Sequence, residues 1–182
     1  KGVTFLRDPR GWKRSGHVLQ RYLDTPWLVH DRKIEIRVFA LVRDDGSVRV
    51  FREGLVRCAH LPFTLDDLDP LIHNSNSMYQ TRRGVTDVEQ HLLSDLDAGP
   101  GTMDAMVDLI EDSVAILQRK RCFRGTGDFE TVGYDFVVDT DGYPWALEAN
   151  RFPGLYFGEP ASDRFHHGMI EDLYCRLLTP DP

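Results

Sequence analysis

Residues 133–150 constrain the fold of this chain more than any other segment, because they have the pattern of a β-hairpin. Two runs of alternating residues flank Asp141-Gly142, a dipeptide that favours a two-residue type I′ turn. Counting back from that turn along an antiparallel ladder places Asp135 opposite Glu148. Side chains alternate between the two faces of a strand, so the two carboxylates share a face. The sequence therefore predicts a hairpin with two acids paired across it.

The two faces of this hairpin differ in chemistry. The apolar face, which we expect to be buried, comprises Tyr134, Phe136, Val138, Trp145, Leu147 and Ala149. The other face carries both carboxylates together with Asn150, which lies opposite Gly133. Two carboxylates about 5 Å apart repel each other by about 3 kcal/mol at an effective dielectric constant near 20, and water, a raised carboxyl pKa or a cation relieves this repulsion. Two carboxylates and an amide oxygen suit Mg²⁺ beside phosphate oxygens; the alternative is a solvated polar face on an edge hairpin.

Length, charge and cysteine spacing exclude several classes of protein. A chain of 182 residues forms one sizeable domain, and its net charge of −7 argues against a general nucleic-acid or anionic-membrane binder. Cys58, Cys122 and Cys175 are widely spaced and lack CxxC spacing, which predicts reduced thiols in a cytoplasmic protein. Neither a long apolar run nor a signal-peptide pattern is present in the sequence. We therefore expect a cytoplasmic protein with no nucleic-acid or membrane partner; no feature predicts an oligomeric state.

Further strands and turns are predicted upstream. Residues 17–23 form a short apolar run, and residues 33–42 alternate, with Ile34, Ile36 and Val38 on one face and Lys33, Glu35 and Arg37 on the other. Asp45-Gly46 predicts a hairpin turn into residues 48–51. Residues 60–84 lack periodicity, which predicts a long functional loop.

Three helices are predicted. A capping box of Thr86 and Glu89 predicts a short helix to Leu93, and helical spacing of apolar residues predicts another to about residue 120, starting near 103. Ser162 is expected to cap a last helix. Because strands and helices do not alternate and hairpins dominate, the fold class is α+β with a mostly antiparallel sheet and flanking helices. The sequence lacks GxGxxG, Walker and GxSxG motifs, which argues against dinucleotide binding, P-loop phosphoryl transfer and serine hydrolysis.

Six segments occur in the order found in the tubulin–tyrosine ligase-like family. They are Gln20-Arg21-Tyr22, Lys33-Ile34-Glu35-Ile36-Arg37, Arg52-Glu53-Gly54-Leu55-Val56-Arg57, His73-Asn74-Ser75-Asn76, Gly133-Tyr134-Asp135-Phe136 and Pro144-Trp145-Ala146-Leu147-Glu148-Ala149-Asn150. The chain therefore resembles the ATP-grasp catalytic core of that family over roughly residues 1–157. The resemblance implies that residues 1–182 are one catalytic region, the C-terminal part of an ATP-grasp fold whose N-terminal part is missing before Lys1.

The resemblance also implies an activity. Enzymes of this family use ATP and Mg²⁺ to join a free amino acid to a carboxylate of a peptide or protein acceptor through an acyl phosphate. Asp135, Glu148 and Asn150 resemble the family's Mg²⁺ ligands, which agrees with the hairpin count. Such chemistry needs neutralisation of phosphate charge more than covalent help from the protein.

The same resemblance assigns the other site residues. The adenine-binding strand would be Gln20, Arg21, Tyr22 and Leu23. Lys33 and Glu35 would serve the phosphates and ribose, and Lys1 is either the last basic residue of a phosphate-covering glycine loop or simply the first residue of the sequence. Arg37 and Arg57 would hold the acyl phosphate or the substrate carboxylate, for which a planar bidentate donor is suited. His73, Ser75 and Asn76 would position the γ-phosphate and the amino acid.

Other interpretations and departures from the family remain open at this point. Arg37 and Arg57 also fit surface ion pairs with Glu35 and Glu53, and His73 also fits a solvated loop histidine. Glu35 replaces the family's Asp, and Asn74-Ser75 replaces Leu-Thr. The absence of the N-terminal lysines predicts weak nucleotide binding and slow turnover. Another ATP-grasp carboxylate–amine ligase and a non-catalytic binding module are the alternative functions.

Overall fold

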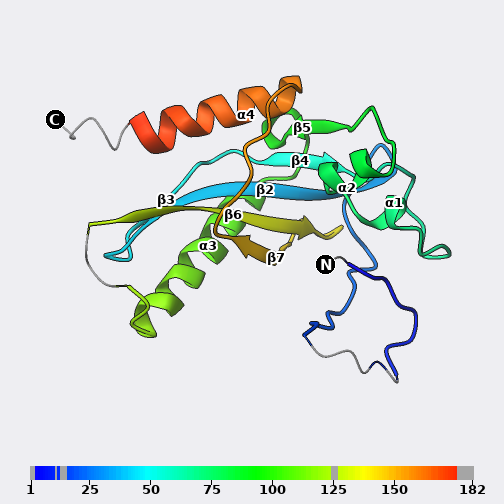
Figure 1. Cartoon of the computed structure of the whole chain (residues 1–182), viewed down its shortest axis with the longest axis horizontal. Helices are drawn as coiled ribbons and strands as arrows, with labels where there is room; N and C mark the ends of the chain where they lie inside the picture. The colour runs from blue at the N-terminus through cyan, green and yellow to red at the C-terminus, as the bar shows by residue number, and fades with distance from the viewer. Residues whose placement is uncertain (1–2, 11, 13–15, 124–126, 176–182) are drawn as a thin grey trace.

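One long strand, β2 (Arg32–Arg43), organises the fold (Figure 1). The computed structural model describes residues 3–10, 12, 16–123 and 127–175. In these ranges β2 lies between β4 (Leu55–Cys58) and β6 (Phe129–Val138), and the sheet order is β5-β4-β2-β6-β7. The outer strands are β5 (Gln90–Leu92) and β7 (Pro144–Asn150), while β1 (Leu28–Val29) and β3 (Val48–Val50) also pair with β2. Every pairing is antiparallel, as the sequence predicts.

Helices cover both faces of the sheet. In Figure 1, α3 (Thr102–Arg119) crosses one face and α4 (Pro160–Ile170) crosses the other. The shorter elements are α1 (Pro70–His73), α2 (Ser77–Arg82), the 3₁₀-helix η1 (Leu93–Asp95) and the π-helical turn η2 (Glu171–Cys175) that follows α4. No helix in the described ranges combines the length and apolar character that crossing a membrane requires.

The alternation of β2 produces a core on each side. Ile34, Ile36 and Val38 are fully buried in the cluster that contains Met106 and Ile110 of α3. The side chains on the other face of the strand form a second cluster. It joins Phe39, Leu41 and Leu55 of the sheet to Phe165, Met169 and Leu173 of α4 and η2. The predicted apolar face of this strand is confirmed; the other face, predicted from Lys33, Glu35 and Arg37 to be charged, is also apolar at Phe39 and Leu41, where α4 covers part of it.

The charged residues of β2 lie on the part of the sheet face that α4 leaves uncovered. On the α4 face, β2 begins with Glu35 and Arg37 and continues with Phe39 and Leu41, so its character changes from charged to apolar along one strand. The apolar end is packed beneath α4. The charged end lies on the same face beside the helix, in the centre of the sheet.

The hairpin of β6 and β7 has the predicted pairing but not the predicted turn. Asp139 accepts a hydrogen bond from the N–H of Gly142 and donates its own N–H to the carbonyl of Tyr143, which closes a three-residue loop over residues 140–142. Gly142 has a φ of 82°, as the last residue of such a loop requires. This loop shifts the ladder by one residue, and an irregularity between Asp135 and Phe136 shifts it back. Two departures from the simple count cancel each other.

The pairing of Asp135 with Glu148 and of Gly133 with Asn150 is thus confirmed. The predicted apolar face is confirmed on β6, where Tyr134, Phe136 and Val138 are buried. It is wrong on β7, where Trp145 and Leu147 are 50% and 38% exposed and Ala149 is also exposed. The shifted ladder pairs Trp145 with Val137 and leaves Leu147 without a cross-strand partner, so neither follows the core face.

Several local expectations also fail. Residues 86–93 do not form a helix: β5 occupies residues 90–92 and pairs with β4, since a segment this short gains more from ladder hydrogen bonds than from an isolated helical nucleus. Residues 60–84 contain α1 and α2 rather than a continuous loop. Ser162 lies inside α4, where its hydroxyl donates to the carbonyl of Tyr156 at 2.6 Å. The α3 helix and the Asp45-Gly46 hairpin are confirmed.

The packing of α4 against the sheet can be tested by its contribution to stability. We expect Phe165→Ala to lower the free energy of unfolding by about 3–5 kcal/mol, because the fully buried ring joins α4 to Phe39 and its loss leaves a cavity. Urea unfolding followed by circular dichroism measures this change. The matched control is Phe152→Ala, whose ring is 84% exposed and whose loss we expect to change stability by no more than about 0.5 kcal/mol. Equal effects of the two variants would contradict this description of the core.

Candidate functional site

Charged side chains from neighbouring strands meet on the α4 face of the sheet. The antiparallel register places Glu35 of β2 opposite Arg57 of β4, and Arg37 of β2 opposite Asp135 of β6. Cross-strand partners share a face and lie within reach of each other. The sheet itself therefore builds a cluster of two acids and two arginines from segments far apart in the sequence.

Asp135 is the centre of this cluster, and its residue is only 1% exposed. The guanidinium of Arg37 donates to both of its oxygens, with Nε–Oδ1 and Nη2–Oδ2 distances of 2.6 Å. Arg57 Nη2 donates to Oδ1 at 2.8 Å, and Asn150 Nδ2 donates to Oδ2 at 3.1 Å. Four donors thus fill the acceptor capacity of the carboxylate, which compensates for its removal from water.

Glu35 extends the cluster toward the loop after α1. It accepts hydrogen bonds from Arg57 Nη2 and, at 3.0 Å, from the hydroxyl of Ser75. Burial raises the pKa of Glu35, the charge of Arg57 lowers it, and the nearby Asp135 raises it again. The net direction is upward, because the carboxyl group is enclosed and shares its arginine with a second acid.

Glu148 and Asn150 approach the cluster from β7. The amide nitrogen of Asn150 donates to Glu148 Oε1 at 2.9 Å as well as to Asp135. One amide therefore bridges both carboxylates, and the predicted convergence of these three side chains occurs. Rotation of the amide by a half-turn presents its oxygen instead, which gives three hard oxygen donors of the kind that Mg²⁺ takes. The donor set fits this ion, and Arg37 holds Asp135 in the present conformation.

A cavity of about 220 Å³ opens beside these residues. Its wall includes both arginines of the cluster, Glu148, Asn150 and Asn76. Arg57 is 8% exposed, and within the described part of the chain its Nε has no hydrogen-bond partner. Two arginine side chains in the wall of a cavity are suited to an anionic ligand.

Tyr22, Lys33 and His73 form an adjoining group. The ammonium of Lys33 lies 4.3 Å from the centre of the Tyr22 ring. Burial lowers the pKa of Lys33 to about 8, and the charge of Glu35 opposes this shift. The Lys33 cation is therefore only partly compensated, which leaves it available to a phosphate.

His73 is buried, so the interpretation of a solvated histidine is wrong. Its Nε2 lies 2.7 Å from the carbonyl of Asp67, which can only accept, so Nε2 carries the proton. Its Nδ1 then accepts from the hydroxyl of Tyr22 at 2.8 Å. Both ring nitrogens of His73 are used to hold Tyr22 and the α1 region together, and a catalytic role for His73 stays a prediction.

The remaining predicted residues have different surroundings. Gln20 and Arg21 are exposed, Leu23 is half-buried, and residues 17–23 do not form the expected strand. The described strands do not pair with this segment, so its backbone lacks the ladder that a strand needs. Asn76 caps α2 by accepting the N–H of Tyr79 at 3.0 Å, a structural role in addition to lining the cavity. Lys1 lies outside the described residues.

Sequence reasoning missed part of the cavity wall. The loop residues 152–154 and Tyr156, with Ser162 and His166 of α4, also line it. Burial lowers the pKa of His166, which favours a neutral ring there. The Gly/Pro content of residues 151–160 predicts a loop directly after Glu148 and Asn150. Loops at such positions often contact ligands, so this segment could have been included in the predicted site.

The predicted surface ion pairs are correct in part. Arg57 pairs with Glu35, but it also pairs with Asp135 in the interior. Glu53 instead accepts from the backbone of Gly54 and from Ser94. The side chains of Arg57 and Arg37 are only 9% and 12% exposed, respectively. They therefore belong to one interior network and not to separate surface ion pairs.

Comparisons with known proteins show which family this chain belongs to. The model of the tubulin-tyrosine ligase family matches residues 3–97 and 100–180. Similar proteins include the probable tubulin polyglutamylase TTLL9 of Bos taurus, 28% identical over 87% of the chain and 38% of the relative. Tubulin glycylase 3B of Tetrahymena thermophila is 24% identical over 88% of the chain and 15% of the relative. Protein monoglycylase TTLL8 of Mus musculus is 27% identical over 91% of the chain and 22% of the relative.

The chain therefore spans well under half the length of these relatives, and its identity to them is low. The family match, by contrast, extends over nearly the whole sequence and includes every strand of the central sheet. On this evidence the chain belongs to the tubulin-tyrosine ligase family, which is part of the ATP-grasp superfamily.

Proposed function

We propose that this chain is the C-terminal catalytic region of an ATP- and Mg²⁺-dependent ligase that adds an amino acid to a carboxylate of a peptide or protein in the cytoplasm. The observation that carries the proposal is the meeting of Asp135, Glu148 and Asn150 beside Arg37 and Arg57, all of which except the buried Asp135 line one cavity. Three potential oxygen ligands and two arginine cations at one place suit a metal–phosphate ligand and an anionic substrate.

The proposed roles of the residues follow from their surroundings. Asp135, Glu148 and Asn150 would hold Mg²⁺, and Lys33 would neutralise phosphate charge next to Tyr22. Ser75 fixes one oxygen of Glu35 and thereby orients the other toward Arg57. Bound ATP with Mg²⁺ would supply the γ-phosphoryl group that activates the acceptor carboxylate as an acyl phosphate, with release of ADP. Attack by the amine of the amino acid would then form the amide bond and release phosphate.

Arg37 has to exchange partners for this function. In the present conformation it donates to both oxygens of Asp135. An anionic substrate in the adjacent cavity offers the same guanidinium an equivalent bidentate acceptor, while a cation near Asp135 replaces its charge. The two events support each other because each leaves the other partner of the ion pair compensated. Arg57, held by both Glu35 and Asp135, stays in place as the fixed cation.

The relatives support a protein acceptor. Their names describe a polyglutamylase and a glycylase of tubulin, and a monoglycylase of proteins. We propose that this chain likewise modifies a protein carboxylate with a small amino acid. A second function is favoured by one observation: the complete hydrogen bonding of Asp135 also suits a non-catalytic module in which the cluster is a structural ion-pair network.

Binding of ATP separates these functions. We expect Glu148→Gln to weaken ATP binding in the presence of Mg²⁺ by about tenfold or more, while binding without Mg²⁺ changes little, because only the metal complex uses this carboxylate. Isothermal titration calorimetry measures both affinities. Glu111→Gln on the exposed face of α3 is the control. Amino-acid-dependent ADP release with acceptor peptides then tests the ligase reaction, and the absence of Mg²⁺-dependent ATP binding would favour the non-catalytic module.

Asp135 tests the structural part of the same network. We expect Asp135→Asn to lower the free energy of unfolding by about 3–5 kcal/mol, because it leaves Arg37 and Arg57 buried without their shared counter-charge. Urea unfolding measures the loss. Asp108→Asn, an exposed position on α3, is the control and should leave stability nearly unchanged. If Asp135→Asn is equally harmless, the arginines are not held as described.

Lys33 predicts a pH dependence of nucleotide binding. Its pKa of about 8 means that the cation is complete below that pH and is lost as the pH rises through it. We therefore expect the affinity for ATP to fall above pH 8, by at most about tenfold per pH unit. In Lys33→Arg the side chain keeps its charge and this fall should disappear. Affinities measured from pH 6.5 to 9.5 test the assignment, and an identical pH profile for the two proteins would refute it.

A further inference from the structure

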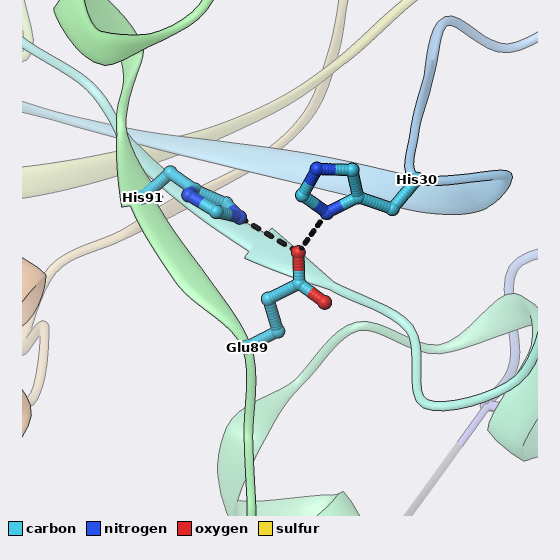
Figure 2. Close-up of side chains that lie close together, drawn as sticks. All are labelled: His30, Glu89 and His91. Atoms are coloured by element: carbon cyan, nitrogen blue, oxygen red, sulfur yellow. Dashed lines mark hydrogen bonds and ion pairs between the residues drawn. The ribbon is translucent and has the colours of Figure 1, made fainter.

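A second group of ligand-type side chains lies at the β5 edge of the sheet (Figure 2). It consists of His30 from the turn between β1 and β2, Glu89 from the segment before β5, and His91 from β5 itself. One ligand atom from each residue lies within 4.8 Å of the other two. None of these residues lines the cavity described above.

Both histidines are aimed at the same carboxylate oxygen. His30 Nδ1 lies 2.6 Å and His91 Nε2 lies 2.8 Å from Glu89 Oε1, and Figure 2 shows both rings directed at this oxygen. The other oxygen, Oε2, pairs with Arg32 Nη1 at 2.9 Å. The arginine fixes the orientation of the carboxylate and leaves Oε1 to the histidines, which is the arrangement by which an outer partner orients a metal-binding carboxylate.

The backbone conformation at His30 determines the direction of its side chain. Val29 pairs with Arg32, so His30 and Asp31 form a two-residue hairpin loop, with φ values of 48° and 61°. Such a loop favours Asn and Gly, because other residues meet steric strain in the left-handed region. Histidine and aspartate adopt this conformation more readily than most residues other than glycine, so the loop forms here and directs the ring of His30 to Glu89.

We propose that His30, Glu89 and His91 bind a divalent transition-metal ion of the Zn²⁺ type. Two imidazole nitrogens and one carboxylate oxygen are a borderline ligand set that suits Zn²⁺, whereas Mg²⁺ prefers oxygen ligands alone. Bonds of about 2.0–2.1 Å in a tetrahedral site separate ligand atoms by roughly 3.3 Å. His30 Nδ1 and His91 Nε2, now 2.6 Å and 2.8 Å from Glu89 Oε1, would move away from that oxygen by about 0.7 Å and about 0.5 Å, and the two nitrogens, now within 4.8 Å of each other, would take the same spacing. Each neutral ring carries its proton on the other nitrogen when it binds, and a water completes the coordination.

The position of this site gives it a structural consequence. Gln90 lies between Glu89 and His91 in the sequence, pairs with Arg57 in the ladder and lines the cavity of the candidate active site. The backbone carbonyl of Glu89 also accepts the N–H of Cys58 at the end of β4. An ion held at this edge therefore joins the β1–β2 turn to the strand that borders Arg57. It braces one wall of the candidate site without contacting the ligand there.

Zinc titration tests the proposal on the chain itself, without nucleotide. Calorimetry with Zn²⁺ should show one saturable site per chain that an excess of Mg²⁺ does not displace. His30→Asn keeps a residue that tolerates the left-handed turn, and His91→Gln keeps a polar side chain; each should lower the Zn²⁺ affinity about tenfold or more. The control His167→Gln removes an exposed histidine of α4 and should bind Zn²⁺ as the unaltered chain does.

Two further measurements exclude indirect effects. Co²⁺ in place of Zn²⁺ should give the visible absorption of a tetrahedral ion in the unaltered chain and in His167→Gln, but not in Glu89→Gln. Zn²⁺ should raise the melting temperature of the unaltered chain and not of His91→Gln, because ligand binding stabilises only a protein that binds. Absence of saturable Zn²⁺ binding, or binding by His30→Asn and His91→Gln as tight as that of the unaltered chain, would overturn the proposal. Because ATP takes no part, these results are independent of the proposed ligase activity.

Discussion

The buried carboxylate of Asp135 is the interaction on which the polar part of this structure depends. An isolated carboxylate at this depth is costly, so the sheet surrounds it with Arg37, Arg57 and Asn150. These partners come from β2, β4 and β7, and only an antiparallel order with β2 and β6 as neighbours brings them together. The register of the sheet and the compensation of one charge are therefore a single constraint.

The same constraint explains the close packing around Arg37. A Cβ on Gly133 would lie 2.8 Å from Pro153 Cβ and 3.0 Å from Arg37 Cδ. Glycine at this position lets the loop after β7 approach the arginine and press its guanidinium toward Asp135. The loop that lines the cavity and the arginine that faces it are thus held against one backbone position, which couples the shape of the cavity to the ion pair.

Local patterns predicted the core of this fold because the physics is local there. Ile34, Ile36 and Val38 alternate with charged residues, and a strand with this pattern has one stable orientation. The pairing of Asp135 with Glu148 was also predictable, but only because a three-residue loop and a ladder irregularity compensate each other. The exposure of Trp145 shows what the simple count lacked, since a one-residue shift moves a side chain to the other face.

The parts that could not be predicted depend on tertiary contacts. The capping box just upstream of residues 90–92 predicts a helix, but β4 offers these residues backbone hydrogen bonds. A short isolated helix would not gain as much stabilisation. Residues 17–23 have an apolar pattern and yet find no strand to pair with in the described sheet. The same limit applies to the site: the bidentate hold of Arg37 on Asp135, and the cavity wall from α4, follow from packing that spacing alone does not encode.

Strand β5 connects the two groups of ligand-type side chains in this molecule. Gln90 lines the cavity on one side, whereas Glu89 and His91 meet His30 on the other, because successive residues of a strand face opposite directions. The donors differ as much as the faces do: oxygen atoms with arginines at the cavity, imidazoles with one carboxylate at the edge. This difference would let one short strand border the two proposed metal sites, since hard and borderline ions select between such ligand sets. A change at the edge reaches the cavity through the position of Gln90 and the ladder to Arg57, without a shared ligand.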